Sequence, residues 1–129
     1  GTSSSDEGWG VTTDSSGNIY VTGYTKGDLD GNTNSGAPAG AGTLYRDIVL
    51  VKYNSSGTKQ WTKLLGTSFD DEGRGVTTDS SGNIYVTGKT GGVYNSAYAH
   101  LYGGLDGNTS LGGGYDIFLV KYNSDGVKQ

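Results

Sequence analysis

The stretch Gly-Val-Thr-Thr-Asp-Ser-Ser-Gly-Asn-Ile-Tyr-Val-Thr-Gly occupies residues 10–23 and returns unchanged at residues 75–88. It lies inside a longer match, in which residues 1–25 and 66–90 are identical at 21 of 25 positions with an offset of 65. Further along, residues 47–60 match residues 116–129 at 11 of 14 positions with an offset of 69. The chain is therefore two copies of one unit, joined to each other directly, with a loop of variable length inside each.

Each copy contains the pattern of two β-hairpins. In the first copy, residues 10–14 and 19–25 are rich in β-forming residues and flank a short turn sequence, and residues 47–54 and 59–66 repeat this arrangement. Repeats of this length are typical of propeller blades or stacked arrays, in which each unit buries its faces against its neighbours. We therefore predict an all-β fold of tandem four-stranded antiparallel blades of the β-propeller type, in an incomplete ring or a linear array.

The repeat boundaries predict two units. The first covers residues 1–65 with a loop insertion at 26–46, and the second covers residues 66–129 with a loop insertion at 91–115. The second unit stops where the first continues as Trp61-Thr62-Lys63-Leu64-Leu65, so its last strand is missing. Two blades do not close a ring of about four to eight blades, which predicts a longer chain, self-association or linear stacking.

The third strand of each unit has apolar residues on both faces. Residues 48–51 read Ile-Val-Leu-Val and residues 117–120 read Ile-Phe-Leu-Val, a pattern that predicts a strand covered on both sides by neighbouring sheets. The order of strands in the sheet should follow the chain, because the polar fourth strand suits an edge. Without a fourth strand, the second unit would expose an apolar edge for assembly, formed by Ile117, Phe118, Leu119 and Val120.

Two motifs in the chain resemble the bacterial seven-bladed β-propeller repeat (SBBP) family. They are Asp-Ser-Ser-Gly-Asn-Ile-Tyr-Val-Thr-Gly, at residues 14–23 and 79–88, and the Asp-Ile-x-Leu-Val-Lys-Tyr-Asn segments at 47–54 and 116–123. The first motif is also similar to blades of the NHL class. The resemblance implies a propeller-blade fold and a secreted or cell-surface location, and it carries over no catalytic residue.

Composition excludes several classes of function. Thirteen acidic and nine basic residues give a formal net charge of −4, which is opposite in sign to the footprint of a nucleic-acid-binding protein. There is no Cys for thiol chemistry or disulfides, and no apolar run reaches the ~18 residues of a membrane span. The 25 Gly residues point to many turns and a thin core.

The two loop insertions share the sequence Leu-Asp-Gly-Asn-Thr and contain the candidate metal ligands. Alternating oxygen donors in the first loop resemble the start of a calcium-binding loop, with equivalents in the second loop: Asp28, Asp30, Asn32, Asn34, Asp106 and Asn108. The alternative reading is a set of Asx and Asp-Gly turns. Asp6-Glu7 and Asp70-Asp71-Glu72 offer further oxygens near the unit boundaries, where a solvated acidic turn is the alternative.

The second loop also carries tyrosines and the single histidine of the chain. Tyr94, Tyr98 and Tyr102 recur every four residues, so a helical turn would place them on one face as a platform for a sugar. The alternative is that the rings pack the loop onto the blade. His100 has no recognisable nucleophile motif beside it, and we expect no enzymatic activity.

These observations leave two functional hypotheses. The first is an extracellular structural or scaffold repeat protein that assembles with copies of itself or with further blades through blade faces and sheet edges, with a filament as one form of the assembly. The second is a surface adhesion module that binds glycan or protein through its two variable loops, with calcium as a possible cofactor. Near-identical repeats favour the first hypothesis, and the divergence of the loops favours the second.

Overall fold

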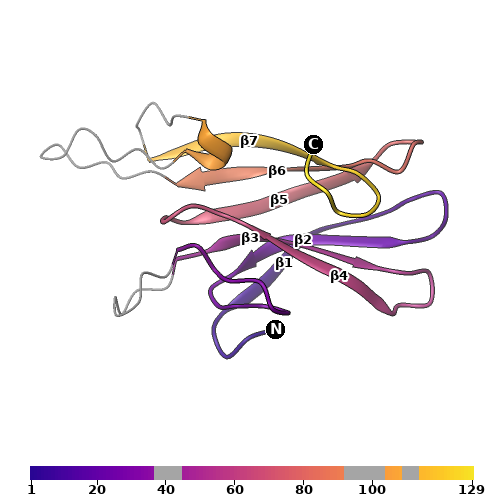
Figure 1. Cartoon of the computed structure of the whole chain (residues 1–129), viewed down its shortest axis with the longest axis horizontal. Coiled ribbons are helices and arrows are strands. Elements are labelled where there is room, and N and C mark those ends of the chain that lie inside the picture. Colours follow the sequence, from indigo (N-terminus) through magenta and orange to yellow (C-terminus); the bar gives the residue numbers. More distant parts are fainter. Residues whose placement is uncertain (37–44, 92–103, 109–113) are drawn as a thin grey trace, which may run out of the picture.

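The computed structural model describes residues 1–36, 45–91, 104–108 and 114–129, which form two antiparallel sheets (Figure 1). The first sheet holds β1 (Asp6–Thr13), β2 (Ile19–Thr25), β3 (Asp47–Tyr53) and β4 (Lys59–Leu65), in that order. The second holds β5 (Asp71–Thr78), β6 (Ile84–Gly91) and β7 (Tyr115–Tyr122). This confirms the predicted all-β fold of tandem antiparallel blades, with strands in chain order.

The turns between the strands follow from Asp and Gly residues. Asp14 Oδ1 accepts hydrogen bonds from the backbone N–H groups of Ser16 and Asn18, at 2.9 and 3.0 Å, which closes an Asx turn between β1 and β2. Gly17 supplies the positive φ that ends this turn, at 77°. Asp79 makes the same bonds between β5 and β6. The repeated Asp-Ser-Ser-Gly-Asn sequence is therefore a structural turn.

The inner strand of each sheet is longer than predicted. β1 begins at Asp6, four residues before the predicted start at Gly10, and its pairing with β2 shifts register between Gly8 and Gly10. β5 shifts in the same way between Gly73 and Gly75. The first half of the strand consists of charged residues and glycines, which have low β-propensity. The bulge also interrupts the alternation of side chains by which a strand is recognised in a sequence.

Residues that are paired across antiparallel strands point to the same face of a sheet, which defines two faces for each blade. We call the leading face the one that carries Ile48 and Leu50 in the first sheet and their repeat equivalents, Ile117 and Leu119, in the second. The opposite side is the trailing face, which carries Ile84 and its neighbours Val86, Val120 and Tyr122 in the second sheet.

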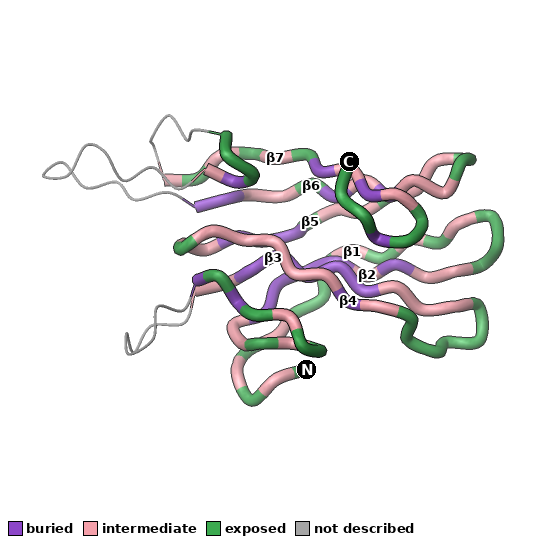
Figure 2. Tube along the Cα trace, in the orientation of Figure 1, coloured by how far each residue is buried: buried purple, intermediate pink, exposed green. Residues whose placement is uncertain are grey.

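The two blades stack leading face to trailing face. One buried cluster contains Tyr20, Ile48 and Leu50 from the leading face of the first sheet. The same cluster takes in the trailing-face residues Ile84, Val86, Val120 and Tyr122 of the second sheet. Figure 2 shows the consequence: β3 is largely buried, whereas β7 is largely half-buried or exposed.

Part of the second loop joins this junction. A short 3-10 turn, η1 (Leu105–Gly107), places the side chain of Leu105 in the same buried cluster. In the parts of the chain that the structure describes, no helix is long and apolar enough to cross a membrane.

Candidate functional site

The leading face of the second sheet is an exposed apolar surface. Ile117 is 92% exposed and Leu119 is 70% exposed, whereas their equivalents in the first sheet, Ile48 and Leu50, are 2% and 1% exposed. Tyr115 adds a half-exposed ring to the same face. The prediction that both faces of residues 117–120 are covered is therefore wrong for the single chain, because no sheet of the described residues lies on the leading side of β7.

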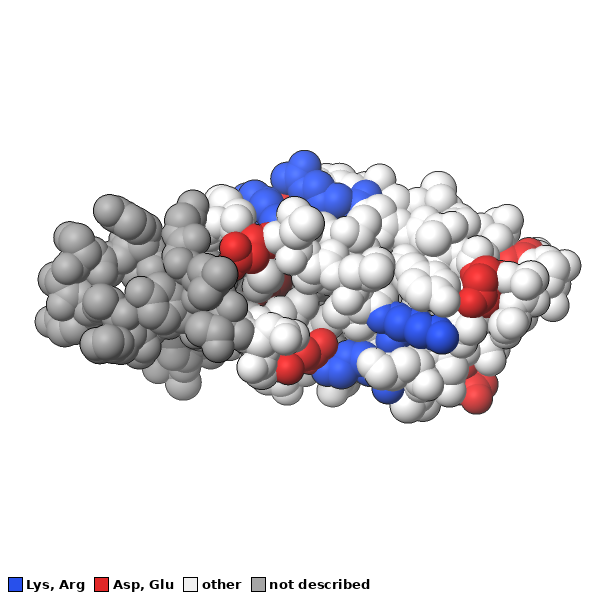
Figure 3. Space-filling view, turned by 90° about the horizontal axis from the view of Figure 1, so that it is seen from above, with Lys and Arg blue, Asp and Glu red and all other residues white. Residues whose placement is uncertain are grey.

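The predicted assembly edge divides between the two sides of β7. Ile117 and Leu119 point to the open leading face, while Val120 is buried at the junction and Phe118 packs against the same cluster. Within the described residues, β7 pairs with β6 and has no strand on its other side beyond a single bridge between Tyr122 and Lys128. Figure 3 views the molecule from the β7 side, where Lys and Arg gather in groups between largely uncharged surface.

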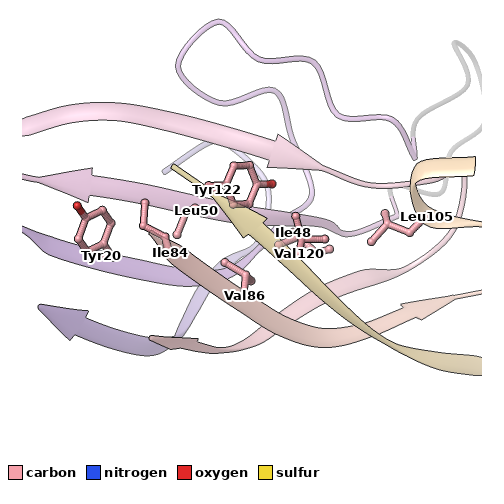
Figure 4. Close-up of a cluster of buried hydrophobic side chains, with 8 residues drawn as sticks. All are labelled: Tyr20, Ile48, Leu50, Ile84, Val86, Leu105, Val120 and Tyr122. Carbon is pink, nitrogen blue, oxygen red and sulfur yellow. The ribbon is translucent and has the colours of Figure 1, made fainter. Parts of the chain in front are cut away.

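The junction inside the chain shows what covers a leading face. Apolar side chains form its centre (Figure 4), and polar contacts lie around them. Lys52 Nζ donates to the backbone oxygen of Ser124 at 2.9 Å, and Thr78 donates to the backbone oxygen of Thr13 at 3.1 Å. The blades therefore meet as a protein interface does, with an apolar centre and a polar rim.

The backbone of β5 also lies close to the first sheet at this junction. A Cβ atom built on Gly73 of β5 would lie 2.3 Å from Thr22 Oγ1 and 3.0 Å from Ile48 Cγ2, both in the first sheet. At Gly8, the equivalent position of the first sheet, the nearest atom to such a Cβ is Val21 Cγ1 at 3.4 Å, in its own sheet. The glycine is thus required where a second blade lies against it.

A buried ion-pair network spans the two blades. Glu72 is almost fully buried, and its carboxylate lies 2.7 Å from Arg46 of the first blade. Arg74 and Lys89 of the second blade lie 2.8 and 3.3 Å from the same carboxylate. Three cations around one acid offset the cost of burying its charge.

A cation lies on an aromatic ring at equivalent places in the two blades, but the position that carries the cation in one blade carries the ring in the other. In the first blade, the Arg46 guanidinium lies 4.8 Å from the centre of the Tyr24 ring. In the second blade the equivalent residues are Tyr115 and Lys89, and the Lys89 ammonium lies 3.8 Å from the centre of the Tyr115 ring. The two blades thus keep a cation–π contact at this place although both residues differ.

The Leu-Asp-Gly-Asn segments of the two loops bind the outer parts of their blades in equivalent ways. Asp30 has a φ of 52° and accepts from Lys59 Nζ at 2.6 Å and from Thr62 Oγ1 at 2.5 Å, both on β4. Asp106 has a φ of 59° and pairs with Lys128, the repeat equivalent of Lys59. Both carboxylates thus tie a loop to the outer part of a blade.

The other candidate metal ligands also make hydrogen bonds within the loops. The Asn32 amide donates to Leu29 O at 3.0 Å, and Asn108 donates to Leu105 O at 3.1 Å. Asp28 Oδ1 accepts from the Asn34 N–H at 2.8 Å, and the Asn34 amide donates to Thr25 O at 3.1 Å. Within the described ranges, no three His, Cys, Asp or Glu residues form a group that could hold a metal. Calcium in these loops stays a prediction.

The predicted tyrosine platform, formed by Tyr94, Tyr98 and Tyr102, lies outside the described residues, and so does His100. At the exit of the first loop, the Tyr45 ring packs edge to face on Phe69, with centroids 6.1 Å apart.

Two buried carboxylates could not be recognised as a pair from the sequence. Asp47 and Asp71 begin β3 and β5, and each is 0% exposed. Burial raises the pKa of Asp47 to about 6, and the nearby charge of Asp71 adds to this effect. Burial also raises the pKa of Asp71. No pattern in the sequence distinguishes these two acids from the solvated ones.

We expect these carboxylates to make the protein less stable as the pH rises from about 4 to about 6. Their pKa values are higher in the folded than in the unfolded state, so the folded state binds more protons in this window and loses stability as they leave. Thermal melting in EDTA from pH 4.5 to 7 should show a falling melting temperature. Asp47→Asn should flatten the curve, and a wild-type melting temperature that rises across this range would contradict the account.

The comparisons with known proteins agree with this geometry. A family model described as SBBP, beta-propeller repeat, matches residues 1–30 and 60–95. An uncharacterized WD repeat-containing protein of Acanthamoeba polyphaga mimivirus is 49% identical over 43 residues, which are 33% of this chain and 3% of that protein. The chain thus spans a small fraction of the length of this relative.

Proposed function

Because this chain belongs to the SBBP beta-propeller repeat family, we propose that it is an extracellular structural module that assembles with further copies of itself through its blade faces. The family match confirms the resemblance read from the repeated motifs. The observation that carries the proposal is the contrast between Ile117 and Leu119, which are exposed, and Ile48 and Leu50, which a second blade covers.

The internal junction supplies a template for the contact between copies. The trailing face of an incoming first sheet would cover Ile117 and Leu119, as the second sheet covers Ile48 and Leu50. Lys121, the equivalent of Lys52, would then reach the backbone of Ser55, the equivalent of Ser124. Near-identical repeats support this reading, because equivalent residues would face each other at the junction between copies as they do inside the chain.

Such a contact is heterologous, since the leading face of one copy meets the trailing face of the next. Interfaces of this kind close into a ring when the rotation per unit permits, and otherwise extend into a filament. Propeller rings of about four to eight blades correspond to about two to four copies of a two-bladed chain.

A charge placed on the open face tests the proposal. We expect the wild-type chain to sediment as oligomers whose size increases with concentration, and Leu119→Asp to sediment as a folded monomer, because the charge would be buried without a partner. Val127→Asp, at an exposed apolar residue outside β7, is the matched control and should associate like the wild type. A wild-type chain that stays monomeric at high micromolar concentration would refute the proposal.

A second candidate function is adhesion to glycan or protein through the loops at 26–46 and 91–115. The divergence of these loops between otherwise near-identical copies supports it, because binding specificity commonly resides in loops on a constant scaffold. Placing the first loop in both copies separates the two candidates: assembly through blade faces should survive the exchange, and binding that depends on the second loop should not.

A further inference from the structure

Three buried side-chain oxygens near the linker between the blades have no hydrogen-bond partner. They are Asp47 Oδ1, Asp71 Oδ1 and Thr90 Oγ1. Unpartnered buried oxygens are rare in proteins, because each loses its bonds to water without gaining others. A bound ligand or a proton would reduce the free-energy cost of burying these three oxygens.

The three residues come from neighbouring strand ends. Asp71 and Thr90 are directly paired across β5 and β6, and the Thr90 hydroxyl beside the carboxylate partly offsets the rise that burial gives the pKa of Asp71. The Asp71 N–H donates to the backbone oxygen of Arg46 at 2.7 Å, which brings the start of β5 beside the start of β3, where Asp47 lies. The charge of Asp71 is close enough to raise the pKa of Asp47.

The linker between the blades contacts both carboxylates and holds one oxygen of Asp71. Thr67 donates to Asp71 Oδ2 from its N–H at 2.6 Å and from its hydroxyl at 2.8 Å. The first loop holds Asp47 Oδ2 through the Ser35 N–H at 2.6 Å. A Cβ on Gly66 would lie 2.2 Å from Asp47 Oδ1, so the linker lies directly against this carboxylate. Each acid thus has one oxygen held by hydrogen bonds and one without a hydrogen-bond partner.

No cation of the described residues forms an ion pair with either acid. The guanidinium of Arg46, the residue before Asp47, pairs instead with Glu72 at 2.7 Å and with Asp70 at 3.9 Å. Two buried carboxylates without a counterion are costly when ionised. A divalent ion would neutralise both charges, and carboxylate and hydroxyl oxygens are the ligands that calcium prefers.

We propose that Asp47 and Asp71, assisted by the Thr90 hydroxyl, bind a calcium ion that fastens the two blades to each other at the linker. This site differs from the loop residues Asp28, Asp30 and Asp106 considered above, which already have partners in the fold. The proposal concerns one chain and stands independently of whether copies associate.

Calcium titration of the full chain after treatment with EDTA tests the proposal. At pH 7.5, isothermal titration calorimetry should find one calcium ion per chain, and millimolar calcium should raise the melting temperature by several degrees, in the affinity range of extracellular calcium modules. Asp47→Asn and Asp71→Asn should each remove the shift. Thr90→Val should keep the fold and raise the calcium concentration at half-saturation about tenfold or more.

Asp30→Asn and Asp106→Asn are the matched controls, and both should retain the calcium shift. The proposal is overturned if the wild type neither binds calcium nor gains stability from it. It is equally overturned if the shift survives in Asp47→Asn and Asp71→Asn but disappears in the control variants, which would place the ion in the loops. Should both linker variants fail to fold, an unchanged half-saturation concentration in Thr90→Val would count against the site.

Discussion

Leu50→Ala is expected to lower the free energy of unfolding by about 2–5 kcal/mol, the range seen when a buried Leu is truncated and leaves a cavity. Leu50 is 1% exposed and lies in the cluster between the two blades. Leu119→Ala makes the same chemical change at the equivalent position of the second blade, where the side chain is largely exposed. We expect it to cost less than about 0.5 kcal/mol.

Urea denaturation of both variants at a concentration where the chain is monomeric measures this contrast. The comparison controls for the residue, the strand and the local sequence, since 48–54 and 117–123 are nearly the same. Equal costs at the two positions would mean that the second blade does not cover the first, and would contradict the stacking described above.

Gly73→Ala is expected to cost about 1–3 kcal/mol, the usual range for overpacking a filled interior. The added methyl group would overlap Thr22 Oγ1 and Ile48 Cγ2 and would come within 3.2 Å of the backbone oxygen of Gly23. These atoms belong to the first blade, so relief of the overlap requires the blades to move apart.

Gly8→Ala is the matched control for this substitution. Gly8 occupies the equivalent position in β1, and a methyl group there would touch only Val21. Replacing a strand glycine with alanine restricts the unfolded chain, so this variant should be as stable as the wild type or slightly more stable. A loss of stability in Gly8→Ala as large as in Gly73→Ala would show that the strand, and not the junction, requires glycine.

Local features of the fold could be predicted from the sequence because short-range chemistry decides them. The hairpin turns follow from Asp14, Asn18 and Gly17, whose side-chain bonds and positive φ act within five residues. The buried third strand follows from apolar residues on both of its faces. The start of β1 at Asp6 could not be predicted, because a bulge at Gly8 and Gly10 interrupts the alternation.

Features that depend on contacts between distant segments could not be predicted. Asp30 has the residue type and spacing of a calcium ligand, and only the fold reveals that Lys59 and Thr62 bind its carboxylate. The sequence offers Asp71 as one of several oxygens for a cation near the unit boundary, with a solvated acidic turn as the competing reading. Asp71 is buried because it packs against the first blade, and the residues around it in the sequence do not indicate this contact.

Cross-linking between copies tests the central claim most directly, because the chain contains no cysteine of its own. Leu50 shares the junction cluster with Ile84, and the repeat equivalents of these residues are Leu119 and Ile19. A mixture of Leu119→Cys and Ile19→Cys chains, treated with a short bis-maleimide, should give a cross-linked dimer that neither variant gives alone. A dimer from Leu119→Cys alone, or no dimer from the mixture, would contradict stacking of leading face on trailing face.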